Sequence, residues 1–493
     1  MESITEKSSL QKRNANEVVM KKIINRLMIA VLAVIWTQSC ISAPPSRGPR
    51  LTNHGQVFFY LSCSKRPTFD ISFSISGMSF MNKEGVWIDV ALDKRIHSAE
   101  LAERQIKLSE FYLPAGKYKR IKWTISEAEV KKVKKSFTLA VPQPGEEHFV
   151  DIEFSVLGRE SQCLFADWDP EQSVFEKYLF RPELTIRKQG AEITKTLIYV
   201  TNTDSHCVTV IDREQDMVVA SIAVGRAPVG IVARADGRRV YVANSGSDTI
   251  SVIDTAINRV INTISNLGYS PAELALSEVR QTLYATNPDS DNVSVIDTVA
   301  RAVIGRISVG KRPCCIAVDE DRRKIYVTNT GSHTISVIDM YEDNYERSVE
   351  KTITVGLNPT GMVIHEDKLY VANSGSNSIY VMDIPLQPPY RPTKTISVGQ
   401  KPTRMLSGLQ ERIYVSNANS NEISFVYPRM GLVDRNVMAG DLPSEMAIDQ
   451  LRRKLYVVNS MSEDVSVIDL PTYTMKKVIQ VGKTPHGIAL IEE

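Results

Sequence analysis

Seven short segments, each running from a glycine to a proline three residues later, carry the side chains best placed to bind a ligand. They read VGRAP, LGYSP, VGKRP, VGLNP, VGQKP, AGDLP and VGKTP. Their middle positions hold five basic residues against one acidic residue. Clustered loop cations favour an anionic ligand, although solvated loop side chains without a function would have the same composition. The candidate ligand-binding residues are Arg226, Lys311, Arg312, Lys401, Arg404, Lys483 and His486.

Two acidic residues reduce the positive charge of these segments. Glu273 and Glu445 stand two residues after their prolines, at the position that Arg404 occupies in another segment. The net charge of the whole chain is only +2, so no global field requires nucleic acid or a membrane surface as a partner. The segments therefore predict a mildly basic funnel and no more.

Motifs of catalysis and cofactor binding are missing from the sequence. It contains no P-loop, GxSxG, HExxH or CxxCH motif. His206 and His333 occupy equivalent turns, and His486 could approach His206, but two histidines are too few for a metal site. Solvent-facing turn histidines are the alternative. We expect no catalytic residue, no metal and no cofactor.

The segments belong to a longer pattern that repeats through the C-terminal part of the chain. Short β-rich runs separated by Gly, Asn, Asp, Ser and Pro recur four times in each unit, and these residues supply turn geometry. Four short strands in a unit of about 42 residues predict one blade of a β-propeller. A run of the type IYVTN returns every 42 to 44 residues, at Tyr199, Tyr241, Tyr284, Tyr326, Tyr370, Tyr414 and Tyr456.

The phase of the repeat predicts how the ring closes. The array begins with three strands that lack a preceding PxGI run and ends with PHGIAL, which lacks a following IYVTN run. Together these pieces make one blade, so we expect the C-terminal strand to pair inside the first blade. Closure would remove the exposed edges of an open array.

These seven units resemble the YVTN family of β-propeller repeats, from Leu197 to Glu493. The resemblance implies a seven-bladed propeller, but that family includes surface-layer proteins, periplasmic binding propellers and domains of redox enzymes, so it does not select an activity. Blade six departs from the pattern, since Tyr427-Pro428 replaces the usual Ile-Asp. We expect a distorted turn there.

A different pattern precedes the repeats. In KRIKWTI, Lys122 and Thr124 alternate with Ile121 and Trp123, as in a strand with one buried face. The segment loosely resembles a β-sandwich domain of unknown function found in bacterial lipoproteins, through LPAGKY and FADWDP…YLFRPEL. The basic run from Lys117 to Lys135 is interpreted as a solvated strand face, with a polyanion site as the alternative.

The N-terminus has the layout of an export signal. Basic residues at 21, 22 and 26 precede the apolar run LMIAVLAVIW, which is too short to span a bilayer as a helix. Ser39-Cys40 resembles the bacterial lipobox, although Thr37 stands where an aliphatic residue is usual, and this resemblance implies lipidation of Cys40. A conventional cleaved signal is the alternative. Met20 is the expected start of translation, and the expected regions are signal 1–40, linker 41–55, β-sandwich-like domain 56–190 and propeller 191–493.

Export permits disulfides. Adjacent Cα atoms are about 3.8 Å apart, less than the usual disulfide span of about 4.4–6.8 Å. We therefore expect Cys314 and Cys315 to be buried thiols and not a vicinal bridge. A bridge between Cys63 and Cys163 remains open.

The sequence predicts an all-β protein: a seven-bladed β-propeller closed by its C-terminal strand, behind a small β-sandwich-like domain. Its expected role is that of a non-enzymatic, monomeric cell-envelope lipoprotein, at the outer membrane or cell surface. Its propeller face would bind an anionic polymer, including nucleic acid, or a protein, because loops on rigid scaffolds carry recognition. A propeller enzyme of lactonase or dehydrogenase type and a structural module of a surface assembly are the alternatives.

Overall fold

The computed structural model describes residues 53–491, apart from gaps at 64–68, 102–103, 133–134, 143–147, 177, 191–195, 343, 346–347, 386–389 and 410. The expected signal, Cys40 and the linker up to residue 52 lie outside this part of the chain. Within it, no helix has both the length and the apolar character needed to cross a bilayer.

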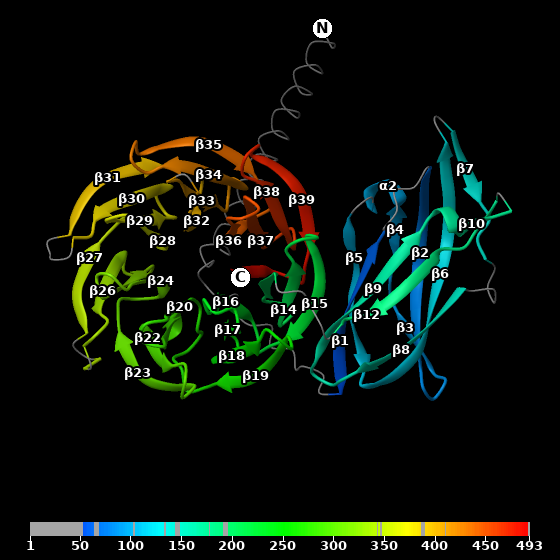
Figure 1. Ribbon diagram of the computed structural model, residues 1–493, viewed down its shortest axis with the longest axis horizontal. Coiled ribbons are helices and arrows are strands. Elements are labelled where there is room, and N and C mark those ends of the chain that lie inside the picture. Colours follow the sequence, from blue (N-terminus) through cyan, green and yellow to red (C-terminus); the bar gives the residue numbers. More distant parts are fainter. Residues whose placement is uncertain are drawn as a thin grey trace, which may run out of the picture. The chain divides into compact units, whose positions relative to one another are not determined.

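Residues 54–188 form a β-domain of two main sheets (Figure 1). The first sheet has the order β12-β9-β1-β5, from Glu183–Lys188, Ser161–Asp169, His54–Ser62 and Gln105–Pro114. The second has the order β3-β2-β6-β7, from Trp87–Val90, Asp70–Asn82, Gly116–Lys132 and Lys135–Leu139, with β4 (Lys94–His97) beside β2 and β8 (His148–Val156) beside β6. Smaller elements are α2 (Ser98–Leu101), η1 (Glu171–Ser173), β10 (Val174–Phe175) and β11 (Leu179–Phe180).

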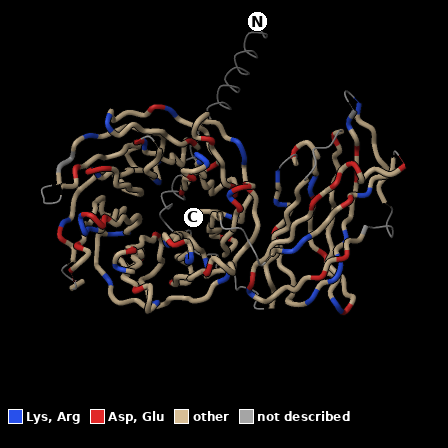
Figure 2. The backbone as a smooth tube through the Cα atoms, viewed as in Figure 1, with Lys and Arg blue, Asp and Glu red and all other residues tan. Residues whose placement is uncertain are grey.

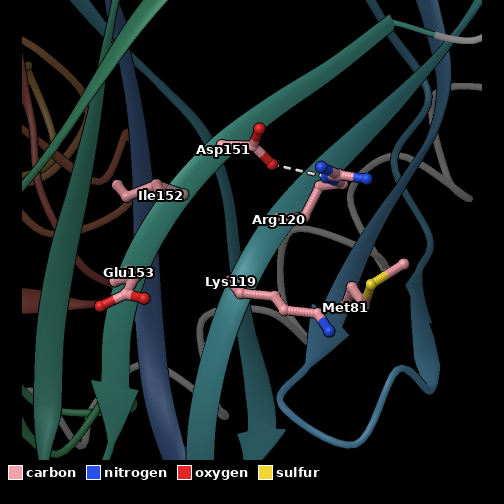
Figure 3. Close-up of a pocket in the computed structure, with 6 residues that line it drawn as sticks. All are labelled: Met81, Lys119, Arg120, Asp151, Ile152 and Glu153. Atoms are coloured by element: carbon pink, nitrogen blue, oxygen red, sulfur yellow. Dashed lines mark hydrogen bonds and ion pairs between the residues drawn. The ribbon is translucent and has the colours of Figure 1, made fainter.

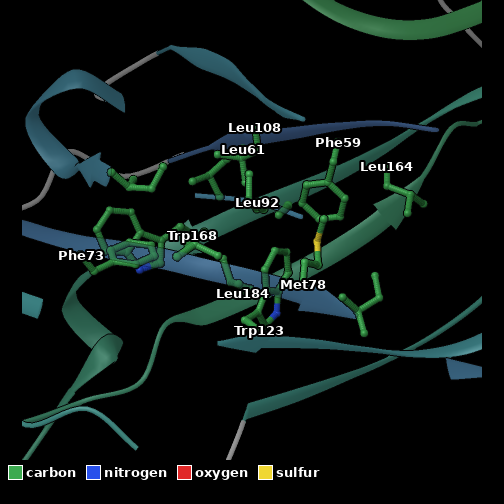
Figure 4. Close-up of a cluster of buried hydrophobic side chains, with 14 of the residues drawn as sticks. Phe59, Leu61, Phe73, Met78, Leu92, Leu108, Trp123, Leu164, Trp168 and Leu184 are labelled. Carbon is green, nitrogen blue, oxygen red and sulfur yellow. The ribbon is translucent and has the colours of Figure 1, made fainter. Parts of the chain in front are cut away.

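The core of the β-domain lies between these two sheets (Figure 4). Ile121 and Trp123 of β6 are buried, whereas Thr124 is exposed, which confirms the alternation predicted from KRIKWTI. The Trp123 ring meets Phe59 of the opposite sheet edge to face, with centroids 5.2 Å apart. Such aromatic pairs stabilise beyond the area that they bury.

Seven four-stranded antiparallel sheets form the propeller, which confirms the predicted fold (Figure 1). Blades 1 to 3, from the inner strand outward, are β40 (Pro485–Leu490), β13 (Leu197–Asn202), β14 (Cys207–Asp212) and β15 (Met217–Ala223); β16 (Pro228–Ala233), β17 (Arg239–Asn244), β18 (Thr249–Asp254) and β19 (Arg259–Ile264); β20 (Leu274–Ser277), β21 (Thr282–Asn287), β22 (Asn292–Asp297) and β23 (Ala302–Ser308), with η2 (Pro288–Ser290) between β21 and β22.

The remaining blades follow the same plan. Blades 4 to 7 are β24 (Pro313–Asp319), β25 (Lys324–Asn329), β26 (Thr334–Asp339) and β27 (Val349–Thr354); β28 (Pro359–His365), β29 (Lys368–Asn373), β30 (Ser378–Asp383) and β31 (Arg391–Ser397); β32 (Pro402–Ser407), β33 (Ile413–Asn417), β34 (Glu422–Tyr427) and β35 (Leu432–Met438); β36 (Pro443–Asp449), β37 (Lys454–Asn459), β38 (Asp464–Asp469) and β39 (Thr474–Gln480).

The C-terminal strand closes the ring as the repeat phase predicted. Strand β40 pairs antiparallel with β13, so that Ile198 faces Leu490 and Val200 faces Ile488. Blade 1 is therefore built from both ends of the repeat array. This pairing covers the inner edge of β13 and gives blade 1 the same four strands as the other blades.

Blade 6 does not have the distorted turn that its sequence suggested. Tyr427 pairs with Leu432 across the turn, and Asp297 pairs with Ala302 across the same turn of blade 3. Both turns therefore have the same length. The sequence change is absorbed because the Tyr427 hydroxyl is hydrogen-bonded by Arg412, whose guanidinium lies 4.6 Å from the Tyr427 ring centroid.

The asparagine that ends each IYVTN run explains the glycine of each loop segment. Asn329 is buried, and its Nδ2 donates to Thr334 and Ser336 of the next strand. A Cβ added at Gly310 would come within 2.6 Å of the Asn329 Cγ. The same close approach recurs for every blade, which requires glycine at Gly225, Gly268, Gly310, Gly356, Gly399, Gly440 and Gly482.

The β-domain packs on the flank of blade 1. Phe58 and Tyr60 of β1 share a buried cluster with Ile198 of blade 1. Gln105 forms two hydrogen bonds with the backbone of Val218, accepting from its N–H at 2.9 Å and donating to its carbonyl at 3.3 Å. The N-terminal domain is therefore held by both apolar and polar contacts.

Candidate functional site

The Gly-x-x-Pro segments form seven loops with one shared backbone conformation. In each, the residue before the proline has a left-handed backbone, with φ between 47° and 60°, which is uncommon for residues other than glycine. In six of the seven loops the N–H of that residue caps a turn of the preceding blade, as when Ser270 donates to Asp248 (2.7 Å) and Arg312 donates to Asp291 (2.8 Å). The seven residues are Ala227, Ser270, Arg312, Asn358, Lys401, Leu442 and Thr484.

Each loop is also held by the blade that follows it. The backbone N–H groups of Ser245 and Gly246 donate to the carbonyls of Ala227 and Arg226. The loops are thus fixed between turns of two neighbouring blades. A rigid backbone lowers the entropic cost of binding through loop side chains.

Two histidines serve this loop framework. The Nδ1 of His206 accepts the N–H of Ala227 at 3.1 Å, and the Nδ1 of His333 accepts the N–H of Asn358 at 3.1 Å. They occupy the same place as Asp248 and Asp291 in other blades. His206 is buried, so the interpretation of this residue as a solvent-facing turn histidine is wrong.

The predicted basic residues fall into two groups. Arg226, Lys311 and Lys483 are exposed, whereas Arg312 and Lys401 are half-buried. Burial lowers the pKa of Lys401 from its ordinary value. None of Arg226, Lys311, Arg312 and Lys483 forms an ion pair with a carboxylate in the described part of the chain.

Large uncharged side chains lie next to the exposed cations in ring order. Tyr269, on the loop between those of Arg226 and Lys311, is 67 % exposed. Leu357, on the next loop after Lys311, is 54 % exposed. We call Lys483, Arg226, Tyr269, Lys311 and Leu357, which stand on five consecutive loops, the loop sector.

Charges are mixed over the rest of the propeller. In Figure 2 basic and acidic positions are interspersed around the whole ring. The loop sector therefore differs from its surroundings by the position of its cations on neighbouring loops of one ring and not by belonging to a broad basic face.

Arg404 does not belong to the loop sector, because its side chain is buried at the centre of the ring, where it forms ion pairs with two glutamates. Its side chain is 9 % exposed. Its Nη2 donates to Glu273 of blade 3 at 2.9 Å, and its Nε donates to Glu445 of blade 7 at 2.8 Å. Its Nη1 donates to the Thr360 carbonyl of blade 5 at 2.9 Å. One guanidinium thus connects four blades.

Two carboxylates share this single cation. Burial raises the pKa of Glu273 to about 7; Arg404 opposes that shift, and the nearby Glu445 adds to it. In the sequence, both glutamates occupy the repeat position that Arg404 occupies in its own segment. Nothing in that pattern indicates that the three side chains meet.

His486 lies beside this group in the inner strand of blade 1. Its Nδ1 is buried and has no hydrogen-bond partner among the described residues. Burial, aided by the charge of Arg404, lowers its pKa to about 3. At neutral pH His486 is therefore an uncharged imidazole and contributes no positive charge to an anion site.

Of the two adjacent cysteines, Cys315 is a free buried thiol, so the two do not form a vicinal bridge. Cys314 is disulfide-bonded, so the prediction of a buried thiol is wrong for this residue. Burial raises the pKa of Cys315 to about 12. Cys63 and Cys163 lie in different hydrophobic clusters, and no disulfide joins them. Among the described residues no group of three or more His, Cys, Asp or Glu side chains has the geometry of a metal site.

The sequence and the fold match known propellers. The sequence model of the YNCE-like beta-propeller matches residues 190–493. No curated protein matches the chain. A functionally unknown protein of Desulfotomaculum acetoxidans DSM 771 has a TM-score of 0.54 at 14 % identity, covering 60 % of this chain and 99 % of its own. The periplasmic gluconolactonase PpgL of Pseudomonas aeruginosa has a TM-score of 0.52 at 16 % identity, covering 60 % and 99 %.

One more solved structure is similar to the same extent. A putative 6-phosphogluconolactonase of Bacteroides fragilis NCTC 9343 has a TM-score of 0.52 at 16 % identity, covering 60 % of this chain and 98 % of its own. At such identities the likeness establishes a common fold and carries no activity across.

Proposed function

The chain belongs to the YNCE-like beta-propeller family, and from that premise we propose that it is a non-enzymatic cell-envelope protein whose loop sector binds an anionic polymer. The observation that carries this proposal is the exposure of Arg226, Lys311 and Lys483 on rigid loops without ion-pair partners. Because the loop backbones are held in place, binding would order only the side chains of these cations and not the loops themselves.

Tyr269 supports a polymer over a small ion. An exposed aromatic ring between two cations offers a flat contact for a sugar or base, while the cations meet the charged groups on either side. Leu357 extends this apolar contact to the next loop. Sulfate or phosphate alone would use none of these surfaces.

Binding to a labelled heparin fragment, followed by fluorescence anisotropy, tests the proposal. Replacing Arg226, Lys311, Arg312 and Lys483 together by Ser should weaken binding by about a hundredfold, which corresponds to about 2.7 kcal/mol. The matched control replaces Arg238, Arg259, Arg301 and Lys351, which are also exposed but lie outside the loops. Equal losses in the two variants would refute a site on the loop sector.

The proposed anchor is Cys40, on the strength of its lipobox-like setting. Two or more acyl chains would give stable membrane attachment. The Cys40→Ala variant should appear in the soluble fraction of envelope extracts, whereas the parent protein should partition into detergent. An unmodified mature N-terminus in mass spectrometry would show that the protein has no such anchor.

A lactone-hydrolysing enzyme is the second candidate, and the meeting of Glu273, Glu445 and His486 favours it. A carboxyl group with a pKa of about 7 has the properties of a general acid or base. Against this, Arg404 engages both carboxylates directly. We expect no acceleration of D-glucono-1,5-lactone hydrolysis, and a rate that Glu273→Gln abolishes would favour the enzyme instead.

A further inference from the structure

The β-domain carries a hollow of about 470 Å³ on the outer face of its six-stranded sheet (Figure 3). The lining side chains are exposed or half-buried, and one of them, Ile152, also packs against the core of the domain. The hollow combines charged and apolar side chains from β2, β6 and β8. They are Met81, Lys119, Arg120, Asp151, Ile152 and Glu153.

The hollow coincides with an irregularity in strand β6. Tyr118 pairs with Phe154 of β8, but Arg120 pairs with Asp151, so the register shifts at Lys119. The pairing with β2 shifts at the same point, because Tyr118 faces Asn82 and Arg120 faces Met81. Such bulges bend a strand and redirect a side chain, and they are common beside functional sites.

The hollow is lined by two side chains that donate hydrogen bonds, Lys119 and Arg120, and by two carboxylates that accept them, Asp151 and Glu153. The Arg120 Nε donates to Asp151 Oδ1 at 2.5 Å, which fixes both side chains across β6 and β8. Lys119 and Glu153 are exposed and form no ion pair with another described residue. Two cations and two carboxylates leave no excess of either sign.

An aromatic platform adjoins the hollow. The rings of Trp87 and Phe149 stack with centroids 5.8 Å apart and planes inclined by 30°. Trp87 pairs with Met81, and the Arg120 guanidinium lies 5.6 Å from the Phe149 ring centroid. Phe149 remains 43 % exposed, so part of this apolar surface is open to a ligand.

We infer that this face binds a sugar unit of an uncharged glycan. An anion would be repelled by Asp151 and Glu153, and a divalent cation by Lys119 and Arg120. Hydroxyl groups both donate and accept hydrogen bonds, so they can satisfy all four side chains. The apolar face of a pyranose ring can pack on the aromatic platform, and pockets of about 300–1,000 Å³ suit ligands of this size. The basic run Lys117–Lys135 thereby contributes to a glycan site and not to a polyanion site.

Titration of the full-length protein with maltotriose and triacetylchitotriose tests this inference, by ligand-observed NMR and calorimetry. At least one trisaccharide should bind. The double variant Lys119→Ala, Glu153→Gln should raise its Kd about tenfold or more, which corresponds to a loss of about 1.4 kcal/mol. Phe149→Ala should weaken the same sugar, since it removes the ring contact.

The matched control is Arg95→Ala, Glu127→Gln, an exposed ion pair at another place on the same sheet. Its Kd should stay within about twofold of the parent value, because neither residue lines the hollow, and the loss of an exposed ion pair should change stability little. The inference is wrong if neither sugar binds, if both double variants lose affinity equally, or if tripolyphosphate binds this face in place of the sugars. Each of these outcomes leaves the loop sector of the propeller unaffected, because the two surfaces share no residue.

Discussion

Arg404 of blade 6 donates a 2.9 Å hydrogen bond to the Glu273 carboxylate of blade 3, three blades further round the ring. The bond to Glu445 joins blade 6 to its neighbour blade 7, whereas the bond to Glu273 joins two blades that are not neighbours. The centre of the propeller is therefore tied together by one buried cation. Burying such a cluster is costly in itself, and removing one member leaves the rest unpaired.

The Arg404→Met variant should lose about 3–5 kcal/mol of unfolding free energy, because two buried carboxylates would then share no cation. Urea unfolding followed by far-UV circular dichroism measures this loss, because all four tryptophans lie outside the propeller. The control is Arg429→Met, which removes an arginine that also pairs with two glutamates but is 67 % exposed. It should lose less than about 1 kcal/mol. A small loss at Arg404 would mean that the cluster adds nothing to the ring.

His486 should make the protein sensitive to acid. Its pKa falls from 6.5 to about 3 on folding. Between these values the unfolded chain binds a proton that the folded chain rejects, so stability is present above pH 6.5 and is lost as the pH falls. The His486→Gln variant removes this effect. Its melting temperature should therefore decline less than that of the parent between pH 7 and pH 4.5.

The comparison of the two proteins is essential, because Glu273 acts in the opposite direction. Its raised pKa of about 7 stabilises the protein at low pH and costs stability as the pH rises past the ordinary glutamate value. If the melting temperatures of the parent and of His486→Gln fall equally with pH, the pKa of His486 is not lowered by folding.

Removing residues 485–493 should open blade 1. The deletion exposes the edge of β13 and removes Ile488, which is buried. Full burial of such a side chain is worth about 1.5–3 kcal/mol, and an unpaired strand edge promotes aggregation. The truncated protein should melt lower and form larger species in size-exclusion chromatography. A soluble monomer with an unchanged melting temperature would contradict closure by β40.

The Gly310→Ala variant should destabilise the protein by about 1–3 kcal/mol, because the new methyl group would overlap the buried Asn329. Gly116→Ala is the control, since a Cβ there meets nothing within 4 Å. Chemical denaturation of both variants measures the difference. Similar stabilities would mean that Asn329 can move aside without cost.

The propeller could be predicted because each blade is encoded locally. The IYVTN run, its turns and the Gly-x-x-Pro segment lie within one repeat, and the phase of the repeat then decides that β40 pairs with β13. The asparagine–glycine contact repeats with the same period. Such features follow from spacing alone.

The central cluster could not be predicted in the same way. Arg404 and Glu273 are 131 residues apart, and which inner strands face each other depends on the curvature of the closed ring. The role of His206 was also hidden, because its partner Ala227 lies on a loop of the next blade. The bulge at Lys119 depends on pairing with two strands at once.

The most direct test of the loop sector is the salt dependence of heparin binding. The logarithm of the association constant should fall linearly with the logarithm of salt concentration, because cations on the protein displace counterions from the polymer. Each of Arg226, Lys311, Arg312 and Lys483 changed to Ser should reduce that slope, by up to about one unit per residue. A slope that is the same for the parent and the fourfold variant would contradict binding at the loop sector.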